Sequence, residues 1–411
     1  METAKKKLSL PAWIFIGMFA GILAGLLFLK NPEFTTTYIK PFGTIYINLL
    51  KFLVVPVVLF SITDGVVALQ DIKKVGKIGA RTFIYYMITT AIAVVIGLVF
   101  ANIAKGMNLF PVLNVADAAY EAKSANVMDV IVNIFPSNLF APMVNADMLP
   151  VIVIALFFGA GILLAGEKGK TIGDLVNKMT EVIMQIMMLI IKLTPIGVFC
   201  LMCNVVAVNG PAIVGTLAVV ILVAYIGYIT HVVLVYGSSV KFLSHMSPVA
   251  FFKGLAPAMI TAFTTTSSNA TLPLNIECCN KMGAEPEISS FVLPLGATIN
   301  MDGTAIYMGV TSVFIASCYG IDLTIGQMAT IVLTATLASV GTAGVSGAGM
   351  IMLAMVLESV NIPVAGIALI AGVDKIFDMG RTTLNITGDA TCAIWISKLE
   401  QAKAKKPGMQ A

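Results

Sequence analysis

Residues 374–389 read DKIFDMGRTTLNITGD, inside a stretch of sequence that is otherwise apolar. Five polar side chains recur there at spacings of four, three, four and four residues, which places them on one stripe of a helix. A charge at the centre of a bilayer costs about 2.5–3.5 kcal/mol, so such a cluster persists only where it faces protein, water or ligand. The stripe therefore predicts a functional site within a membrane, and a self-neutralising structural ion network is the alternative. Its members are Asp374, Asp378, Arg381, Asn385 and Asp389.

The composition around this stripe is that of a polytopic membrane protein. Of the 411 residues, 58% are hydrophobic and 11% are charged, whereas soluble domains carry about 25% charged residues. Apolar stretches of spanning length recur along most of the chain, which leaves no room for a large soluble domain. The net charge of +4 comes largely from the termini and loops, so it gives no indication of nucleic-acid binding. The apolar run after Lys5–Lys7 reaches spanning length without a cleavage site, so we expect a retained first helix.

Lysine and arginine residues orient the apolar stretches. By the positive-inside rule, Lys5–Lys7 and the lysines after residue 397 place both termini on the inner side. Residues 168–178 carry three lysines and are expected to form an inner loop, whereas the long polar stretch 107–148 has few cations and is expected outside. The apolar stretches lie at residues 9–29, 42–69, 81–106, 149–166, 179–208, 211–240, 249–280, 286–319, 325–359 and 363–397.

Two of these stretches predict re-entrant hairpins rather than single spanning helices. The string TTTSSNATLP puts polar side chains in the middle of 249–280, and GTAGVSGAG puts small flexible residues in the middle of 325–359. Non-helical backbone at such depth is tolerated only where it is buried or lines a cavity, so two inward-pointing tips indicate a central binding site. Two kinked spanning helices are the alternative. With both hairpins, eight spanning helices remain, and the predicted fold class is an all-α polytopic membrane protein.

The sequence also offers oxygen ligands for a cation and a pair of opposite charges. The string GATINMDGT at 296–304 interrupts the seventh span and frees backbone carbonyls. Such carbonyls, together with carboxylates, suit alkali or alkaline-earth cations such as Na⁺, although an ordinary polar contact between helices is the alternative. Arg381 presents a planar fork for a carboxylate, and Asp378 can receive an ammonium group. A zwitterion with one extra carboxylate fits this pair, and backbone amides at the hairpin tips can hold its α-carboxylate.

An enzyme is not expected from these residues. Asp378 and Asp389 lie about 16 Å apart on one helix, too far to form a carboxylate dyad that shares a proton. Cys200 and Cys203 form a C-x-x-C string in apolar sequence and are interpreted as buried small residues. The two histidines are too few and too separated for a metal site.

Three strings closely resemble the glutamate transporter family: SSNATLP at 267–273, NMDGT at 300–304, and DMGRT followed by NITGD at 378–389. That family includes archaeal sodium/aspartate symporters, mammalian excitatory amino acid transporters and neutral amino acid exchangers. The resemblance covers almost the whole chain and is strongest from 249 to 398. It implies a homotrimer and an elevator mechanism, in which spans 1, 2, 4 and 5 form a fixed scaffold. Spans 3, 6, 7 and 8 and both hairpins would form the moving transport domain.

The same resemblance implies domain boundaries and a location. The scaffold would comprise residues 1–80 and 108–208, the transport domain residues 81–107 and 209–399, and a cytoplasmic tail residues 400–411. We expect a multi-pass protein of a prokaryotic inner membrane, because the chain is compact and shows no targeting sequence. Its expected partners are an amino acid substrate, sodium ions, membrane lipid and two further copies of itself.

Carried over position by position, the resemblance implies a substrate site and three sodium sites. Arg381 would bind the side-chain carboxylate of the substrate, and Asp378 its amine. The expected substrate contacts are Ser267, Ser268, Thr304, Val345, Gly349, Asp378, Arg381, Thr382 and Asn385. The first sodium site would use Gly296, Asn300, Asn385 and Asp389. The second would use Thr298, Ser339, Val340 and Thr342 near the Met301 sulfur. The third would use Tyr86, Thr89, Thr90, Asn300 and Asp302.

Three positions depart from the family pattern. Thr266 and Met379 stand where archaeal and mammalian members, respectively, carry a second arginine, so a cationic partner for Asp378 is expected to be missing. Met308 replaces the glutamate that mammalian members use for proton coupling, and no proton coupling is expected through it. The retained Arg381 favours sodium-coupled symport of L-aspartate or L-glutamate. A C4-dicarboxylate or a neutral or sulfur amino acid is the alternative substrate in the same fold.

Overall fold

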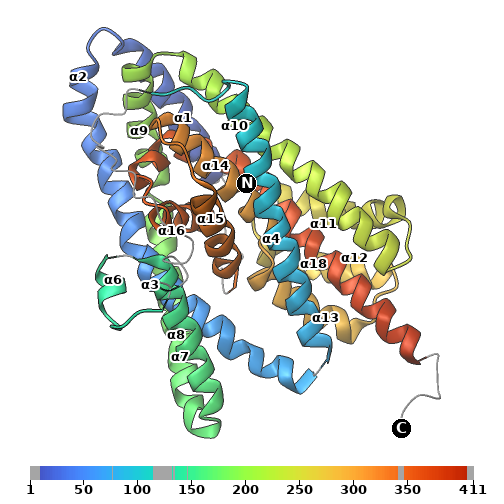
Figure 1. The fold of residues 1–411 in the computed structure, drawn as a ribbon. Coiled ribbons are helices and arrows are strands. Elements are labelled where there is room, and N and C mark those ends of the chain that lie inside the picture. The colour runs from blue at the N-terminus through green and yellow to red at the C-terminus, as the bar shows by residue number, and fades with distance from the viewer. Residues whose placement is uncertain are drawn as a thin grey trace, which may run out of the picture.

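A computed structural model describes residues 10–75, 77–113, 132, 135–145, 147–340 and 347–404 of the chain. Within these ranges the chain forms helices and no strand (Figure 1). The first half contains α1 (Leu10–Leu27), α2 (Pro32–Phe34), the π-helical turn η1 (Thr35–Ile39), α3 (Lys40–Val75), α4 (Lys77–Gly106), α6 (Ala141–Asn145), α7 (Met148–Leu164), α8 (Glu167–Ile191) and α9 (Thr194–Asn209).

The second half is dominated by shorter helices that end in one long helix. Its elements are α10 (Ala212–His231), the π-helical turns η2 (Val232–Tyr236) and η3 (Ser239–Leu243), α11 (Pro248–Thr265), α12 (Ser268–Lys281), α13 (Pro286–Ile299), α14 (Asp302–Cys318), α15 (Ile325–Ala338), α16 (Ala348–Ser359), the 3₁₀ turn η4 (Val364–Gly366), α17 (Ile367–Ala371) and α18 (Asp374–Ala404).

Several helices have the length and surface expected of membrane spans. Three described segments are long and apolar enough to cross a membrane, namely Pro32–Val67, Lys77–Gly106 and Ala212–Leu243. On α4 a continuous apolar stripe faces outward, and its spacing of three or four residues matches one side of a helix. A stripe of this kind is unfavourable in water and is expected in contact with lipid. It consists of Ile84, Ile88, Ile92, Val95, Val99 and Ile103.

The region from 167 to 209 differs from the expectation of an inner loop followed by one span at 179–208. The residues expected in the loop are helical, because α8 begins at Glu167 and runs to Ile191. Gly169 and Gly173 face the protein on this helix, whereas its lysines face outward, so the polar sequence forms an amphipathic helix. A break between α8 and α9 bends the pair by 49°. Residues 167–178 are therefore helical rather than a loop, as the glycine spacing of four residues indicated, and their location on the inner side stays a prediction.

The two segments expected to form hairpins each contain two helices that pack against each other. In the first, α11 ends at Thr265, and Thr266 adopts a left-handed backbone conformation with φ 53° before α12 begins. The Ser267 hydroxyl then caps α12 by accepting a hydrogen bond from the amide of Ala270 at 3.2 Å. In the second, α15 and α16 are joined through residues 341–346, which lie outside the described ranges.

A break in the helical backbone separates α13 from α14 at the expected place. Asn300 has φ −89° and ψ 100°, and Met301 has φ −122° and ψ 41°, so neither residue is helical. The last helix, α18, which is red in Figure 1, packs against α11, α12, α13 and α14. The prediction that 296–304 interrupts a span of helix is confirmed, and this break faces the polar stripe of α18.

The cysteines lie inside the protein. All six are buried thiols, and Cys200 and Cys203 lie on α9 among apolar residues. Their interpretation as buried small residues is confirmed.

Candidate functional site at the polar face of the last helix

The five polar residues of the sequence stripe lie on α18 and are all buried. Asp374, Asp378, Arg381, Asn385 and Asp389 are between 1% and 4% exposed. Helical spacing places them on one face, and the packing of α11 to α14 against this helix covers that face. Burial of four charged groups demands partners, because an isolated charge inside a protein is too costly to keep.

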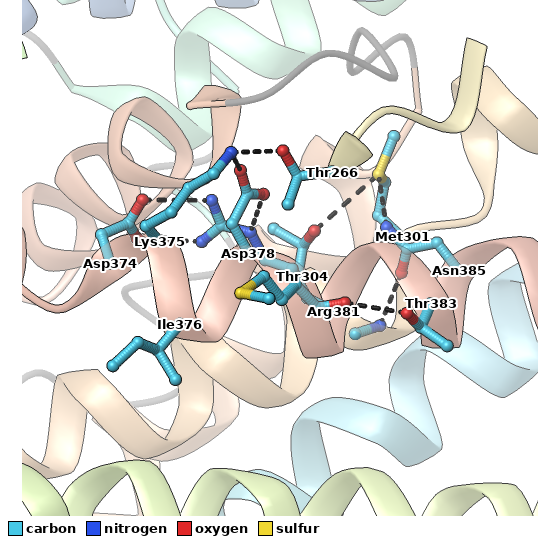
Figure 2. Close-up of polar contacts among 12 residues, drawn as sticks. Thr266, Met301, Thr304, Asp374, Lys375, Ile376, Asp378, Arg381, Thr383 and Asn385 are labelled. Carbon is cyan, nitrogen blue, oxygen red and sulfur yellow. Dashed lines mark hydrogen bonds and ion pairs between the residues drawn. The ribbon is translucent and has the colours of Figure 1, made fainter. Parts of the chain in front are cut away.

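Arg381 is held by two carboxylates, which Figure 2 shows, and by one aromatic ring. Its Nη1 and Nη2 atoms donate to the two oxygens of Asp374 at 3.0 and 3.3 Å. Its Nε donates to Oδ1 of Asp378 at 2.9 Å. The guanidinium carbon lies 4.7 Å from the centre of the Tyr307 ring, a distance at which the cation and the ring attract each other. The bidentate face of Arg381 is therefore occupied by the carboxylate of Asp374 within the chain, and its role toward a substrate carboxylate stays a prediction.

Two glycines allow other helices to approach Arg381 closely. A Cβ atom on Gly349, in the first turn of helix α16, would lie 2.3 Å from Nη1 of Arg381. A Cβ atom on Gly303 would lie 2.3 Å from the Arg381 carbonyl oxygen. No side chain fits at such distances, so glycine at both positions permits the contact between α14, α16 and α18. The predicted substrate contacts Gly349 and Arg381 are thus neighbours.

Lys375 provides the cationic partner that the sequence analysis expected to be missing. Its ammonium group lies 3.4 Å from Oδ2 of Asp378 and also donates to the hydroxyl of Thr266. Lys375 is 6% exposed, and Figure 2 shows it between Asp378 and the tip of the first helical pair. The expectation of a missing partner was wrong, because it considered only the two positions where relatives carry arginine. The spacing of three residues between Lys375 and Asp378 was a usable signal, since such pairs meet on a helix.

A second polar group surrounds the break between α13 and α14. The side-chain amide of Asn300 donates to Oδ1 of Asp389 at 2.9 Å and to the carbonyl of Asn385 at 3.0 Å. The Asn385 side chain accepts from the amide of Gly303 at 2.7 Å and donates to the Met301 sulfur at 3.2 Å. Four of the predicted residues of the first and second sodium sites therefore lie together.

This group has features that suit a small cation. Oδ1 of Asn300 is buried and has no hydrogen-bond partner, which is unusual for a buried oxygen. A Cβ atom on Gly296 would lie 2.5 Å from Oδ1 of Asp389 and 2.7 Å from the Tyr86 hydroxyl, so glycine leaves these oxygens close to the backbone. Carboxylate, amide and carbonyl oxygens are ligands that hard cations prefer. The residues present fit the sodium site expected there.

Asp302 forms the third polar group, at the start of α14. Its Oδ1 accepts from the hydroxyl of Thr90 at 2.6 Å, and its Oδ2 accepts from the hydroxyl of Tyr236 at 2.7 Å. His231 Nε2 lies 3.0 Å from the same Oδ2. The contact between Thr90 and Asp302 agrees with the expected third sodium site. His231 was set aside in the sequence analysis, although a histidine buried in an apolar helix is itself a signal of a polar partner.

The remaining predicted residues differ in how far their side chains are exposed to solvent. Ser268, Thr304, Thr382, Ser339 and Val340 are buried. Thr89 donates within its own helix to the carbonyl of Tyr86 at 3.2 Å, and the exposed Thr298 donates to Leu295 at 2.9 Å. Val345 and Thr342 lie outside the described residues.

A cavity of 180 Å³ opens beside the charged end of the stripe. Asp374, Lys375 and Asp378 of α18 line it, together with Thr265 of α11 and residues of α16. Its opposite wall is apolar and comes from α1 and α8, including Ile14 and Ile191. A larger cavity of 260 Å³ lies between α3, α9 and α17 and contains none of the predicted site residues. We therefore regard the smaller cavity as the access to the candidate site.

Comparison with known proteins identifies the family. The sequence profile of the sodium:dicarboxylate symporter family matches residues 10–399. The proton/sodium-glutamate symport protein of Geobacillus stearothermophilus is 35% identical to this chain and covers 98% of both chains. The proton/glutamate-aspartate symporter of Escherichia coli (strain K12) is 32% identical and covers 98% of this chain and 95% of its own length.

A relative with a different named substrate is nearly as similar. The C4-dicarboxylate transport protein of Rhizobium leguminosarum is 31% identical over 94% of this chain and 88% of its own length. The resemblance drawn from the three sequence strings is thus confirmed. The polar face of α18 therefore belongs to a protein of a membrane-transporter family. The chain belongs to the sodium:dicarboxylate symporter family.

Proposed function

We propose that this protein is a sodium-coupled symporter of acidic amino acids, with L-aspartate and L-glutamate as its substrates. The observation that carries the proposal is the position of Arg381, whose bidentate face is held by a carboxylate beside Gly349. The hydrogen bond between Asn300, at the break between α13 and α14, and Asp389 of α18 supports a cation site beside the same helix face. Relatives named as glutamate and glutamate-aspartate symporters agree with this combination.

In the proposed site, the substrate carboxylate would bind Arg381 at the position that the Asp374 carboxylate occupies in this structure. Paired N–H groups of a guanidinium match a carboxylate in one plane, so a side-chain carboxylate of the substrate can take the same geometry on Arg381. Asp378 would then receive the substrate amine, and Asn385, Thr382 and Thr304 would contact its polar groups. Ser267, Ser268, Val345 and Gly349 would complete the site from the two helical pairs.

Sodium binding would compensate the carboxylates that lie beyond the substrate. Asp389, Asn300, Asn385 and the carbonyl of Gly296 would hold one ion. Asp302 with Thr90, Tyr86, Thr89 and Asn300 would hold another. A third would lie near the Met301 sulfur and would use carbonyls of Thr298, Ser339, Val340 and Thr342. Each ion that enters removes the cost of a buried negative charge, so substrate and sodium binding would favour each other.

The proposal includes the architecture that such transport requires. Eight spanning helices and two re-entrant pairs, α11–α12 and α15–α16, would cross or enter the inner membrane, with both termini on the cytoplasmic side. Helices α1, α3, α7, α8 and α9 would form the scaffold of a homotrimer. Helix α4 and helices α10 to α18 would carry substrate and ions across by an elevator movement. Apolar packing of α3 against α7, α8 and α9 supports a separate scaffold.

Uptake of radiolabelled L-aspartate into proteoliposomes tests the function. An inward sodium gradient is compared with choline, and unlabelled glutamate, serine, cysteine and succinate serve as competitors. We expect sodium-dependent uptake that glutamate inhibits and serine does not. Uptake that is independent of sodium, or inhibition by serine alone, would contradict the proposal.

A C4-dicarboxylate is the second candidate substrate, and one observation favours it. Lys375 and Arg381 place two cations in the candidate site, and two cations can pair with two carboxylates. Asp378 opposes this alternative, because a dicarboxylate without an amine leaves its charge without a partner. Uptake of radiolabelled succinate that exceeds uptake of aspartate would favour the dicarboxylate.

A further inference from the structure

Lys375 occupies a position between two parts of the candidate site. Its ammonium group contacts Asp378 of its own helix and the hydroxyl of Thr266, 109 residues away in sequence. It also lines the 180 Å³ cavity beside the site. The side chain is almost completely buried, and removing a lysine from water is favourable only when its charge is compensated.

The charged end of α18 is formally neutral because of this lysine. Two carboxylates, Asp374 and Asp378, face two cations, Lys375 and Arg381. Without Lys375 the group would carry one net negative charge in a buried environment. Electrostatic repulsion of an incoming ligand would then grow with the negative charge of that ligand.

We propose that Lys375 sets the charge of the substrate site and thereby selects ligands by their own net charge. The proposal rests on the proposed function for the location of the substrate. Aspartate carries one net negative charge at neutral pH, succinate two and serine none. Lys375 therefore favours aspartate over serine, and it is needed most by succinate. It is a specificity-determining residue that acts through charge.

The same contacts allow a different role, in which Lys375 only ties the tip between α11 and α12 to α18. That role depends on the hydrogen bond to the Thr266 hydroxyl. Charge and tether are separable, because Thr266→Val removes the hydroxyl and keeps the lysine. Lys375→Arg keeps the charge, whereas Lys375→Met keeps most of the length and removes the charge.

The experiment measures sodium-dependent aspartate uptake by the wild-type protein and these three variants in proteoliposomes. Lys375→Met is expected to raise the KM for aspartate about tenfold. This is the size expected when one attraction between two partly buried charges, the lysine and the ligand, is lost. Lys375→Arg and Thr266→Val should each stay within about threefold of wild type, since both keep the charge. In Lys375→Met, inhibition by succinate should weaken more than tenfold, and inhibition by serine should stay unchanged or improve.

Equal losses in Lys375→Met and Lys375→Arg, or a loss in Thr266→Val as large as in Lys375→Met, would overturn the proposal in favour of a tether. Thermal unfolding of each purified variant identifies a protein that has failed to fold. A wild-type protein without sodium-dependent aspartate uptake would contradict the proposed function instead. In that case the charge role of Lys375 is tested with the substrate that the wild type does take up. If that substrate is succinate, the charge role predicts that only Lys375→Met loses uptake. If it is serine, the charge role predicts that all three variants retain uptake, and any other pattern contradicts it.

Discussion

The two ends of the polar stripe on α18 compensate their carboxylates in different ways. At the first end, Asp374 and Asp378 contact the permanent cations Arg381 and Lys375. At the other end, Asp389 accepts a hydrogen bond from the neutral amide of Asn300. The neighbouring Asp302 shows the same pattern, since hydroxyl groups and an imidazole surround its carboxylate.

This difference supports the proposed division between a substrate site at the first end and cation sites at the second. Hydroxyl and amide donors lower the cost of a buried carboxylate but leave its charge in place. The negative charges at the first end are therefore neutralised before a ligand arrives. To bind a ligand there, the charged groups must exchange their present ion-pair partners for groups of the ligand. At the second end, the negative charge of the carboxylate would be neutralised mainly by a cation that binds there.

The largest effect is expected from Asp389→Asn. The substitution removes the charge that a sodium ion would compensate and keeps the shape of the side chain. Sodium-driven aspartate uptake should fall more than about 100-fold, the size typical of breaking a buried charge pair. Uptake at increasing sodium concentration measures the loss. Asp322→Asn, at a carboxylate whose side chain is 93% exposed, is the matched control and should transport normally.

Arg381→Cys tests the other end of the stripe. Loss of the guanidinium should weaken aspartate binding about 100-fold, because Asp374 and Asp378 lose their shared partner. Inhibition by neutral amino acids such as serine or cysteine should strengthen in the same variant. Competition against labelled serine measures the change, with Arg81→Cys on α4 as a control. Unchanged aspartate affinity would end the assignment of Arg381 to the substrate carboxylate.

Two alanine substitutions should affect aspartate binding and sodium binding separately. A Cβ atom at Gly349 meets Arg381, whereas a Cβ atom at Gly296 meets Asp389. Gly349→Ala should chiefly raise the KM for aspartate, and Gly296→Ala should chiefly raise the sodium concentration needed for half-maximal uptake, each about tenfold. Gly215→Ala on α10 has open space around the added methyl group and should behave as wild type. Identical effects of the first two variants would show that the two ends do not act separately.

The smallest effect is expected from a pair of adjacent threonines on α4. The Thr90 hydroxyl binds Asp302, whereas the Thr89 hydroxyl binds a carbonyl of its own helix. Thr90→Val should raise the sodium concentration for half-maximal uptake about fivefold, because one hydrogen bond to a charged group is lost. Thr89→Val should raise it less, by about twofold, because the Thr89 hydroxyl of the same proposed sodium site contacts a carbonyl of its own helix and not Asp302. A larger effect at Thr89 than at Thr90 would contradict this order.

Much of the candidate site followed from spacing within single segments. The stripe from Asp374 to Asp389 required only the periodicity of one helix, and the helix break at Asn300 followed from local sequence. Lys375 was also within reach of such logic, since it lies three residues before Asp378. The bend at 192–193 between α8 and α9 was within reach as well, because Lys192 and the Thr194-Pro195 pair interrupt the apolar run and proline disfavours a continuous helix before it.

By itself, the sequence determined the membrane class, the polar helix face and the residue types that suit a carboxylate and a small cation. Only the tertiary structure decided which distant groups meet. His231 reaches Asp302 over 71 residues, Asn300 reaches Asp389 over 89, and Lys375 reaches Thr266 over 109. Helical periodicity fixes neighbours within a few residues, whereas contacts between helices depend on how close small residues such as Gly349 and Gly303 let them pack.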